Sequence, residues 1–237
     1  MTSKIKAGII QSSYLPWRGF FDFISSVDVF IFHDDIQYTK NDWRNRNKIK
    51  AEDDIKWLTM PVKKDKVNKT ITNTFLVNEK YWKKKHLRVI GYYYRNCSHK
   101  EILNQFISDS LDIEHKTISE LNIYLIKRIC KYLKIDTTFL NSNELKVEGQ
   151  KTEKIINLLK KIKADIYLSG PSADSYLDKE LFVSNNINLE YKSYKYKEYP
   201  QLGSSFINNL SIIDLIANCG EKSIDFIKSQ EENIKVI

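Results

Sequence analysis

Two adjacent carboxylates and one histidine are the side chains in this sequence best suited to moving a proton. Asp34 and Asp35 follow an apolar run, where a carboxylate pair can bind a metal, orient an amine or act as a base. His86 is a second candidate base, because imidazole titrates near neutral pH. The alternatives are structural: the acids can cap the turn after the strand, and His86 can be an ordinary helix residue. His33, beside Asp34, is expected to be a satisfied core or edge histidine.

A dense basic and amide segment follows these acids. It contains Lys40, Arg44, Asn45, Arg46, Asn47, Lys48 and Lys50. The planar guanidinium group of arginine matches phosphate or carboxylate oxygens, and asparagine can orient it or contact the hydroxyl groups of a ligand. Acids at a strand end followed by such a segment predict a site for a polar, anionic ligand, although a solvated basic turn would have the same composition.

Two strands are expected to position this site. Apolar runs at 4–11 and 28–33 predict buried strands, and a short helix is predicted between them at 17–26. In an open α/β sheet, ligands bind beyond the carboxyl ends of the parallel strands. Polar residues follow both runs, so we expect these side chains in the site: Gln11, Tyr14, Asp34, Asp35 and Gln37.

The rest of the chain alternates between further strands and helices. Strands are predicted at 56–62, 137–140, 164–168 and 187–194, and helices at 78–96, 100–111, 114–133, 151–163 and 210–217. Gly220 is expected to stop the last helix, and the tail from 222 to be helical and then frayed.

This alternation predicts an α/β fold with a Rossmann-like parallel sheet flanked by helices. The stretch 78–133 is helical for longer than one crossover needs. It is therefore predicted to be an inserted helical subdomain, a cap on a single α/β domain that spans 1–237. The alternative is a second domain that begins after about residue 110, but no change of composition marks such a boundary.

A turn after the strand at 164–168 is a further candidate anion site. Ser169 and Gly170 can offer backbone N–H groups there. The turn lacks the GK[ST] ending of a Walker loop, and no GxSxG nucleophile elbow is present. The tyrosine-rich stretch 191–199 can stack a base or a sugar, or it can be an edge strand with ordinary alternation.

Composition and charge narrow the function classes. The 237 residues are 42% hydrophobic and 29% charged, with a formal net charge of +8, which favours anionic partners. Four histidines and three cysteines show no metal-ligand spacing and no disulfide pattern, so we expect no metal site. No apolar run approaches the roughly 20 residues that span a bilayer, and no signal-peptide core is visible at the start of the sequence. We therefore expect a cytoplasmic protein with no membrane insertion.

The motifs, in their order along the chain, resemble the WbqC-like proteins. The resemblance is carried by QSSYLPWRGFF at 11–21, DDIQY at 34–38, WRNRN at 43–47, WLTMPV at 57–62, Trp82 with His86, LSG at 168–170, Tyr176 with Leu177, YPQ at 199–201 and LSIIDL at 210–215. It covers nearly the whole chain and adds Tyr176 and Gln201 to the candidate binding residues. The family usually has proline after the first glutamine. Here Ser12 stands in that position, so we expect a looser turn.

The resemblance implies a role in the biosynthesis of O-antigen and other bacterial surface polysaccharides, with a suggested glycine transferase activity. We therefore predict an acyl- or aminoacyltransferase that acts on the amine of a nucleotide-linked amino sugar, with an activated acyl donor and no cofactor. In this hypothesis Arg44, Arg46 and Lys50 hold the diphosphate, and Tyr14 and Trp17 line the sugar or base pocket. The proton from the attacking amine goes to one of the candidate bases Asp34, Asp35 and His86.

Two other functions remain open. The protein can be a non-catalytic binding protein of the same pathway that holds a sugar nucleotide or a glycosyltransferase. The charge of +8 also suggests a nucleic-acid binder, but no RNP or helix-turn-helix pattern accompanies it, so nucleic acid is not the expected partner. Self-association as a homodimer is a further possibility.

Overall fold

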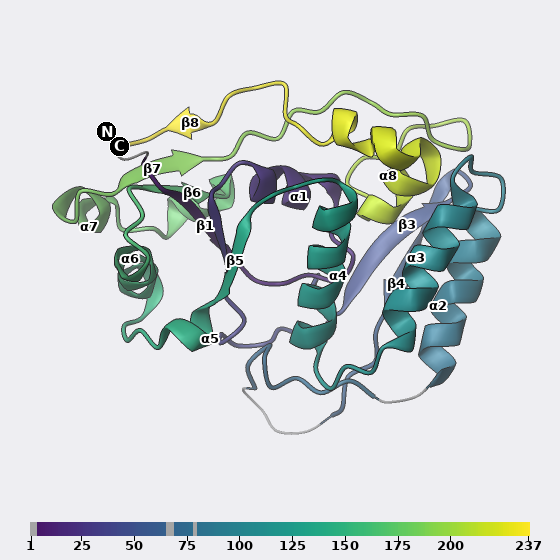
Figure 1. Ribbon diagram of the computed structural model, residues 1–237, viewed down its shortest axis with the longest axis horizontal. Helices are drawn as coiled ribbons and strands as arrows, with labels where there is room; N and C mark the ends of the chain where they lie inside the picture. Colours follow the sequence, from purple (N-terminus) through teal and green to yellow (C-terminus); the bar gives the residue numbers. More distant parts are fainter. Residues whose placement is uncertain (1–3, 65–68, 78–79) are drawn as a thin grey trace.

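A sheet of six strands forms the centre of the protein (Figure 1). The structure is a computed structural model, and it describes residues 4–64, 69–77 and 80–237. The sheet order is β5-β2-β1-β6-β7-β8. The strands are β1 Lys6–Ile10, β2 Val29–Phe32, β5 Thr138–Asn141, β6 Ile166–Ser169, β7 Asn188–Tyr191 and β8 Ile234–Lys235. All neighbours pair in parallel except β7 and β8, so the predicted parallel α/β sheet is confirmed.

The order of the strands reverses at β1. The chain passes from β1 to β2 on one side, and it later returns to pair β6 on the other side of β1. Ile10 of β1 stands beside Phe32 of β2, and Gly8 stands beside Leu168 of β6. Ligands of open α/β sheets bind at such a reversal, outside the carboxyl ends of the strands.

Helices cover both faces of this sheet (Figure 1). They are α1 Arg18–Ser25, α2 Lys80–Tyr93, α3 Lys100–Asp112, α4 Ile118–Tyr132, α5 Ser142–Leu145, α6 Lys151–Lys161, α7 Lys179–Ser184 and α8 Ile212–Cys219, with 3-10 turns η1 Pro171–Ser175 and η2 Gly220–Phe226. Alternation along β2 divides the core in two, because successive side chains of a strand point to opposite faces. Phe30 and Phe32 join the cluster under α1 and α4, whereas Ile31 joins the cluster under α6 and α7.

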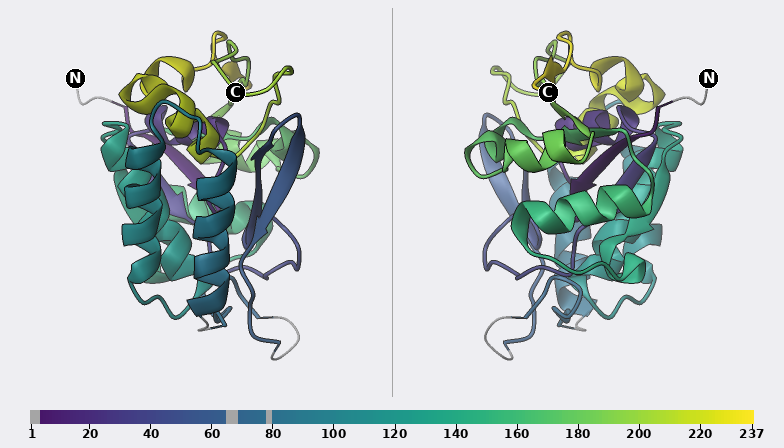
Figure 2. Two further views of the ribbon diagram at one scale, coloured as in Figure 1. Left: turned by 90° about the vertical axis from the view of Figure 1, so that its right-hand side faces the viewer. Right: turned by 90° about the vertical axis from the view of Figure 1, so that its left-hand side faces the viewer.

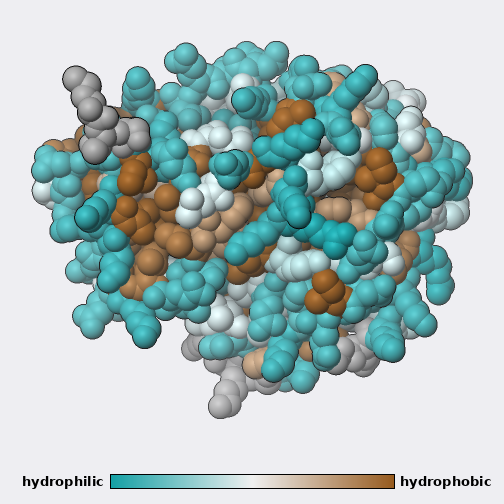
Figure 3. Space-filling view, viewed as in Figure 1, coloured by the Kyte–Doolittle hydropathy of each residue, from teal (hydrophilic) through white to brown (hydrophobic). Residues whose placement is uncertain are grey.

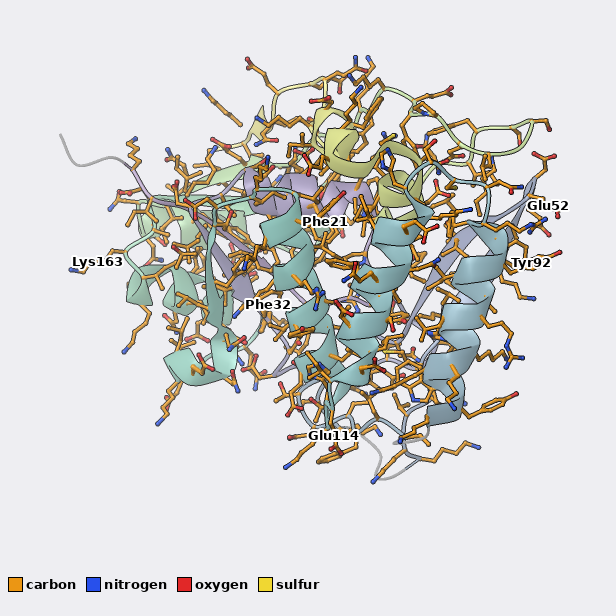
Figure 4. The ribbon with its side chains drawn as sticks, turned by 45° about the vertical axis from the view of Figure 1, so that its right-hand side comes forward. Phe21, Phe32, Glu52, Tyr92, Glu114 and Lys163 are labelled. Carbon is orange, nitrogen blue, oxygen red and sulfur yellow. The ribbon has the colours of Figure 1, made fainter. Side chains whose placement is uncertain are left out.

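The helical structure predicted for 78–133 is confirmed in the described residues by three consecutive helices, α2, α3 and α4, and residues 78–79 lie outside the described part of the chain. Their buried residues, such as Ile90, Leu103 and Leu125, belong to the same cluster as Phe21 of α1 and Phe32 of β2. Figure 4 shows Phe21 and Phe32 inside the molecule, among these helices. The three helices and the sheet therefore share a core. Hydrophilic side chains cover most of the face drawn in Figure 3, with hydrophobic residues exposed between them.

A two-stranded antiparallel ribbon lies outside the main sheet (Figure 2). It consists of β3 Arg46–Ala51 and β4 Asp54–Thr59, with Arg46 opposite Thr59. The strand predicted at 56–62 corresponds to β4, but its partner is β3 and not a strand of the parallel sheet. β3 was not predicted from the sequence, because its outward positions are basic and its hydrophobic alternation is weak.

The end of the chain also differs from the prediction. Gly220 stops α8 with a φ of +54°, a conformation that glycine adopts without strain, so this expectation is confirmed. The tail from 222 was expected to be helical and then frayed. The 3-10 turn η2 agrees with the first part, but the frayed end is wrong. Glu190 and Tyr191 of β7 pair with β8, so the tail extends the sheet by one antiparallel strand.

Candidate functional site

Strand alternation sorts the polar residues beyond β1 and β2 onto two faces of the sheet. Asp34 contacts Ser119 of α4, whereas Asp35 contacts Lys154 of α6. His33 also faces Asp35, as expected for residues two apart on extended backbone. The predicted acid pair therefore consists of two separate groups, one on the α4 side and one on the α6 side.

On the α4 side, Asp34 is fully engaged in hydrogen bonds. Ser12 donates both its N–H, at 2.7 Å, and its Oγ, at 2.6 Å, and Ser119 Oγ donates at 2.5 Å. The side chain is 4% exposed. The looser turn expected at Ser12 is not seen, because Ser12 is held to Asp34 by two hydrogen bonds that a proline, with no N–H and no hydroxyl, could not donate. Asp34 joins the loop after β1 to the first turn of α4.

On the α6 side, Asp35 lies in a partly exposed cluster of charged groups. Lys154 Nζ donates to its Oδ2 at 2.5 Å, and Ser142 Oγ donates to Oδ1. Burial acts to raise the pKa of Asp35, but the hydrogen bonds from Lys154 and Ser142 and the charges of His33 and Lys154 lower it below its ordinary value. Asp35 is therefore a carboxylate at neutral pH.

His33 faces this carboxylate, with Nε2 at 3.6 Å from Asp35 Oδ1. That distance is too long for a hydrogen bond, and Nε2 makes none with the other described residues. The expectation of a satisfied histidine is therefore wrong for this nitrogen. Burial lowers the pKa of His33, partly offset by Asp35 and reinforced by Lys154, so the neutral imidazole is favoured at neutral pH.

His86 has the structural role that the sequence analysis gave as its alternative. Its Nε2 lies 3.2 Å from the carbonyl oxygen of Thr59, which can only accept, so Nε2 carries the proton. Nδ1 then accepts from the Tyr14 hydroxyl at 2.9 Å. Burial lowers the pKa of His86 to about 4. Tyr14 itself is 0% exposed, so neither side chain has surface left for a ligand.

The three cations proposed for the diphosphate contact three different groups. Arg44 Nη1 donates to Gln11 Oε1 at 2.8 Å, and the Arg46 guanidinium lies 4.4 Å from the ring centroid of Trp57. Lys50 Nζ donates to the Ser205 carbonyl and to a side-chain oxygen in the same loop. Burial lowers the pKa of Arg44, although Asp42 and Asp34 act to raise it, and the guanidinium stays charged at neutral pH.

The side-chain amides of Asn45, Asn47 and Gln201 form hydrogen bonds with other groups of the protein. Asn45 Nδ2 donates to the Met60 carbonyl, and Asn47 Nδ2 donates to the carbonyls of Tyr14 and Leu15. Gln201 Oε1 is the second acceptor of Lys50, at 3.2 Å. These contacts fix the loop after β1, the ribbon and the loop at 201–207 to one another.

The remaining candidates lie around the reversal and near the surface. Gly170 has no atom within 4 Å of the position a Cβ would occupy, so space lies beside the end of β6. Ser169 is buried and donates to Tyr167, and Tyr176 is exposed. Trp17 packs on the tyrosine-rich stretch, with ring centroids 5.3 Å from Tyr194 and 5.8 Å from Tyr196. Gln37 forms an isolated β-bridge with Thr70.

Fewer candidate site residues lie near one another in the structure than were proposed from the sequence. Ile10 and Phe32 are register partners, so the residues that follow them, Gln11 and His33, lie beyond the carboxyl ends of the adjacent strands β1 and β2. Arg44 is bound to Gln11, and Asp35 with Lys154 stands behind His33. His33 was given a structural role from the sequence, and Lys154 was not among the candidates. The spacing of His33 and Asp35 at a strand end was a usable signal, whereas Lys154 lies 119 residues further on.

The open, mostly parallel sheet flanked by helices defines the class of this protein as α/β, and the polar and charged groups beyond its carboxyl edge are the candidate site. Among the described residues, no group of three or more histidine, cysteine or acidic side chains is arranged to hold a metal. Within the same described part of the chain, no helix is both long and apolar enough to cross a membrane.

The chain belongs to the WbqC-like protein family, whose model matches residues 11–226. It is 40% identical over 226 residues to the uncharacterized protein Rv1507c of Mycobacterium tuberculosis, covering 94% of this chain and 97% of that protein. No solved structure matches it. The predicted family resemblance is therefore confirmed.

Proposed function

We propose that this protein is a transferase of bacterial surface polysaccharide biosynthesis. It moves a small acyl or aminoacyl group, such as glycyl, onto the amine of a nucleotide-linked amino sugar. The observation that carries the proposal is that Gln11, with Arg44 bound to it, and the His33–Asp35 pair lie beyond the carboxyl ends of two adjacent strands, β1 and β2. Cations and a neutral imidazole at a ligand-binding edge suit an anionic substrate whose amine must lose a proton.

In the reaction, the amine nitrogen of the sugar attacks the carbonyl carbon of the activated donor. A C–N bond forms, the bond from that carbon to its leaving group breaks, and the nitrogen loses one proton. We assign that proton to His33 Nε2, which is buried but has no hydrogen bond with the other described residues, so binding of the substrate has to expose it. Asp35 stabilises the imidazolium that results, because its negative charge lies 3.6 Å away.

The two bases named first from the sequence fit this step less well. Asp34 already accepts three hydrogen bonds, and both ring nitrogens of His86 are engaged in the core. We assign Arg44 to the phosphates of the substrate, because its guanidinium stands beside Gln11 at the same edge. Lys154 keeps Asp35 ionised, and its own positive charge lies on the α6 side of the sheet.

Binding without turnover is the second candidate function. It is favoured by the same engagement of Asp34 and His86, which leaves few bases near the ligand. In this case the protein holds the nucleotide-linked sugar for a glycosyltransferase, and the cations at the edge act in recognition alone.

Mass spectrometry of the acceptor separates the two functions. The protein is incubated with a uridine-diphosphate-linked amino sugar and a panel of activated donors, including glycyl and acyl thioesters and adenylates. A transferase adds the acyl mass to the sugar, whereas a binding protein retains the sugar nucleotide in a calorimetric titration and leaves its mass unchanged. The absence of both binding and mass gain would contradict both functions.

A further inference from the structure

Two tryptophans form an exposed aromatic surface beside the candidate site. Trp43 is 43% exposed and Trp57 is 39% exposed, and their ring centroids lie 5.6 Å apart with an interplanar angle of 34°. We call these two residues the tryptophan platform. Tryptophan has a large apolar ring, so two of them side by side at the surface leave substantial apolar area in contact with water.

The platform lies on the basic face of the ribbon. Arg46 lies over the ring of Trp57, with 4.4 Å between its guanidinium carbon and the ring centroid. Lys48 is the direct cross-strand partner of Trp57, so the two side chains share a face with Arg46. Further along that face, Lys50 is covered by the loop that contains Ser205. The uncovered end of the ribbon therefore combines aromatic rings with two positive charges.

The platform is also tied to the carboxyl edge of the sheet. The Trp43 carbonyl accepts from Tyr14 N–H at 2.9 Å, which attaches it to the loop after β1. The next residue, Arg44, donates to Gln11 at 2.8 Å. Trp43 of the platform is therefore adjacent in the sequence to Arg44, the cation assigned to the phosphates of the substrate.

We infer that the tryptophan platform binds the nucleobase of a nucleoside diphosphate, with Arg46 and Lys48 close to its phosphates. This inference rests on the proposed function and names the part of the protein that holds the nucleotide. A nucleobase offers a flat π-face to stack on tryptophan, and its phosphates complement the neighbouring cations. The residues first expected to line a base pocket are poorer candidates, because Tyr14 is 0% exposed and Trp17 is packed against Tyr194.

Calorimetric titrations with UDP, GDP and inorganic pyrophosphate test this inference. Trp57→Ala and Trp43→Ala remove stacking surface, so each is expected to weaken UDP and GDP binding by about tenfold or more. Neither change is expected to alter pyrophosphate binding. Arg46→Lys keeps the charge but loses the planar group, and it is expected to weaken nucleotide binding less than Trp57→Ala does.

Tyr92→Ala is the matched control. Tyr92 is also exposed, at 55%, and also carries an arginine over its ring, with Arg95 at 4.5 Å. It lies on α2, and Figure 4 shows it pointing away from the molecule. Its removal is expected to leave all three affinities unchanged. Thermal melts identify any variant that fails to fold. If one of the two tryptophan variants does not fold, the other one tests the inference.

Unchanged UDP and GDP affinity in a folded tryptophan variant would overturn the inference and leave the proposed transfer reaction standing. Equal weakening of pyrophosphate and nucleotide would also overturn it. Nucleotide binding that depends on the platform, without any acyl transfer, would support the inference and contradict the transferase. If the wild type binds neither UDP nor GDP, the platform is not a nucleobase site.

Discussion

Asp34 and Asp35 are adjacent in the sequence and differ in almost every physical respect. Asp34 is buried on the α4 side and accepts three hydrogen bonds from serine groups. Asp35 is partly exposed on the α6 side, paired with Lys154 and facing His33. One step along extended backbone turns a side chain to the opposite face of a sheet. The comparison teaches that a pair of acids at a strand end need not be a catalytic pair.

The two histidines differ in the same way. His86 is held in the core between Tyr14 and the Thr59 carbonyl, whereas Nε2 of His33 makes no hydrogen bond with the other described residues. Stability is therefore expected to depend on Asp34 and His86, and proton transfer on His33 and Asp35. The predictions that follow test this division.

The largest effect is expected from His33→Gln. Glutamine keeps a polar side chain of similar size but cannot take up a proton near neutral pH, so the transfer rate should fall by a factor of about 100 or more. The affinity for the sugar nucleotide should change little. Rates by mass spectrometry and affinities by calorimetry check both expectations. His99→Gln is the control, because His99 precedes α3 beside Gly220 and takes no part in the proposed step. A full transfer rate in folded His33→Gln would contradict the assignment.

Asp34→Ala is expected to lower the free energy of unfolding by about 3 kcal/mol or more, because it leaves three buried donors without their acceptor. Asp35→Ala breaks a partly exposed pair and should cost only about 1 kcal/mol or less. Urea unfolding of both variants measures the difference. Equal losses in the two variants would remove the distinction between the two acids.

His86 should make stability fall in mild acid. Its pKa in the folded protein is about 4, against 6.5 for the unperturbed group. A lowered pKa means that its contribution is fully present above pH 6.5 and is lost as the pH falls toward 4. The loss should be on the order of 3 kcal/mol for this group. His86→Gln should therefore lose less of its unfolding free energy between pH 7 and pH 4 than the wild type does. Parallel losses in urea unfolding would show that His86 is protonated equally in both states.

The fold was predicted more completely than the site. Apolar runs such as 28–33 identified the buried strands, because a strand covered on both faces is hydrophobic along its whole length. β3 was missed, since Arg46, Lys48 and Lys50 occupy its outer face and only Ile49 is apolar and buried. Its partnership with β4 depends on the turn at Glu52, which has a φ of +60°.

The position of the candidate site follows from the sequence and stays a prediction, whereas the contacts within it were not predicted. The carboxyl ends of the strands were expected to matter, and the reversal at β1 lies there. Which acid faces which helix depends on how far the extended backbone continues beyond β2. The contact of Asp35 with Lys154 also depends on where α6 crosses the sheet. Such long-range contacts leave no local pattern in a single sequence.

The smallest predicted effect concerns the pH at which transfer begins to fail. Burial lowers the pKa of His33 below 6.5, so the acidic limb of the pH–rate profile should lie below pH 6.5. Asp35 acts to raise this pKa and Lys154 acts to lower it. Asp35→Asn should therefore move the limb to lower pH, and Lys154→Met should move it to higher pH. Shifts in opposite directions, measured as transfer rate against pH, require that the titrating group lies between these two charges. If both variants keep the wild-type limb, another group takes the proton, and the contrast between the two faces of the sheet concerns folding alone.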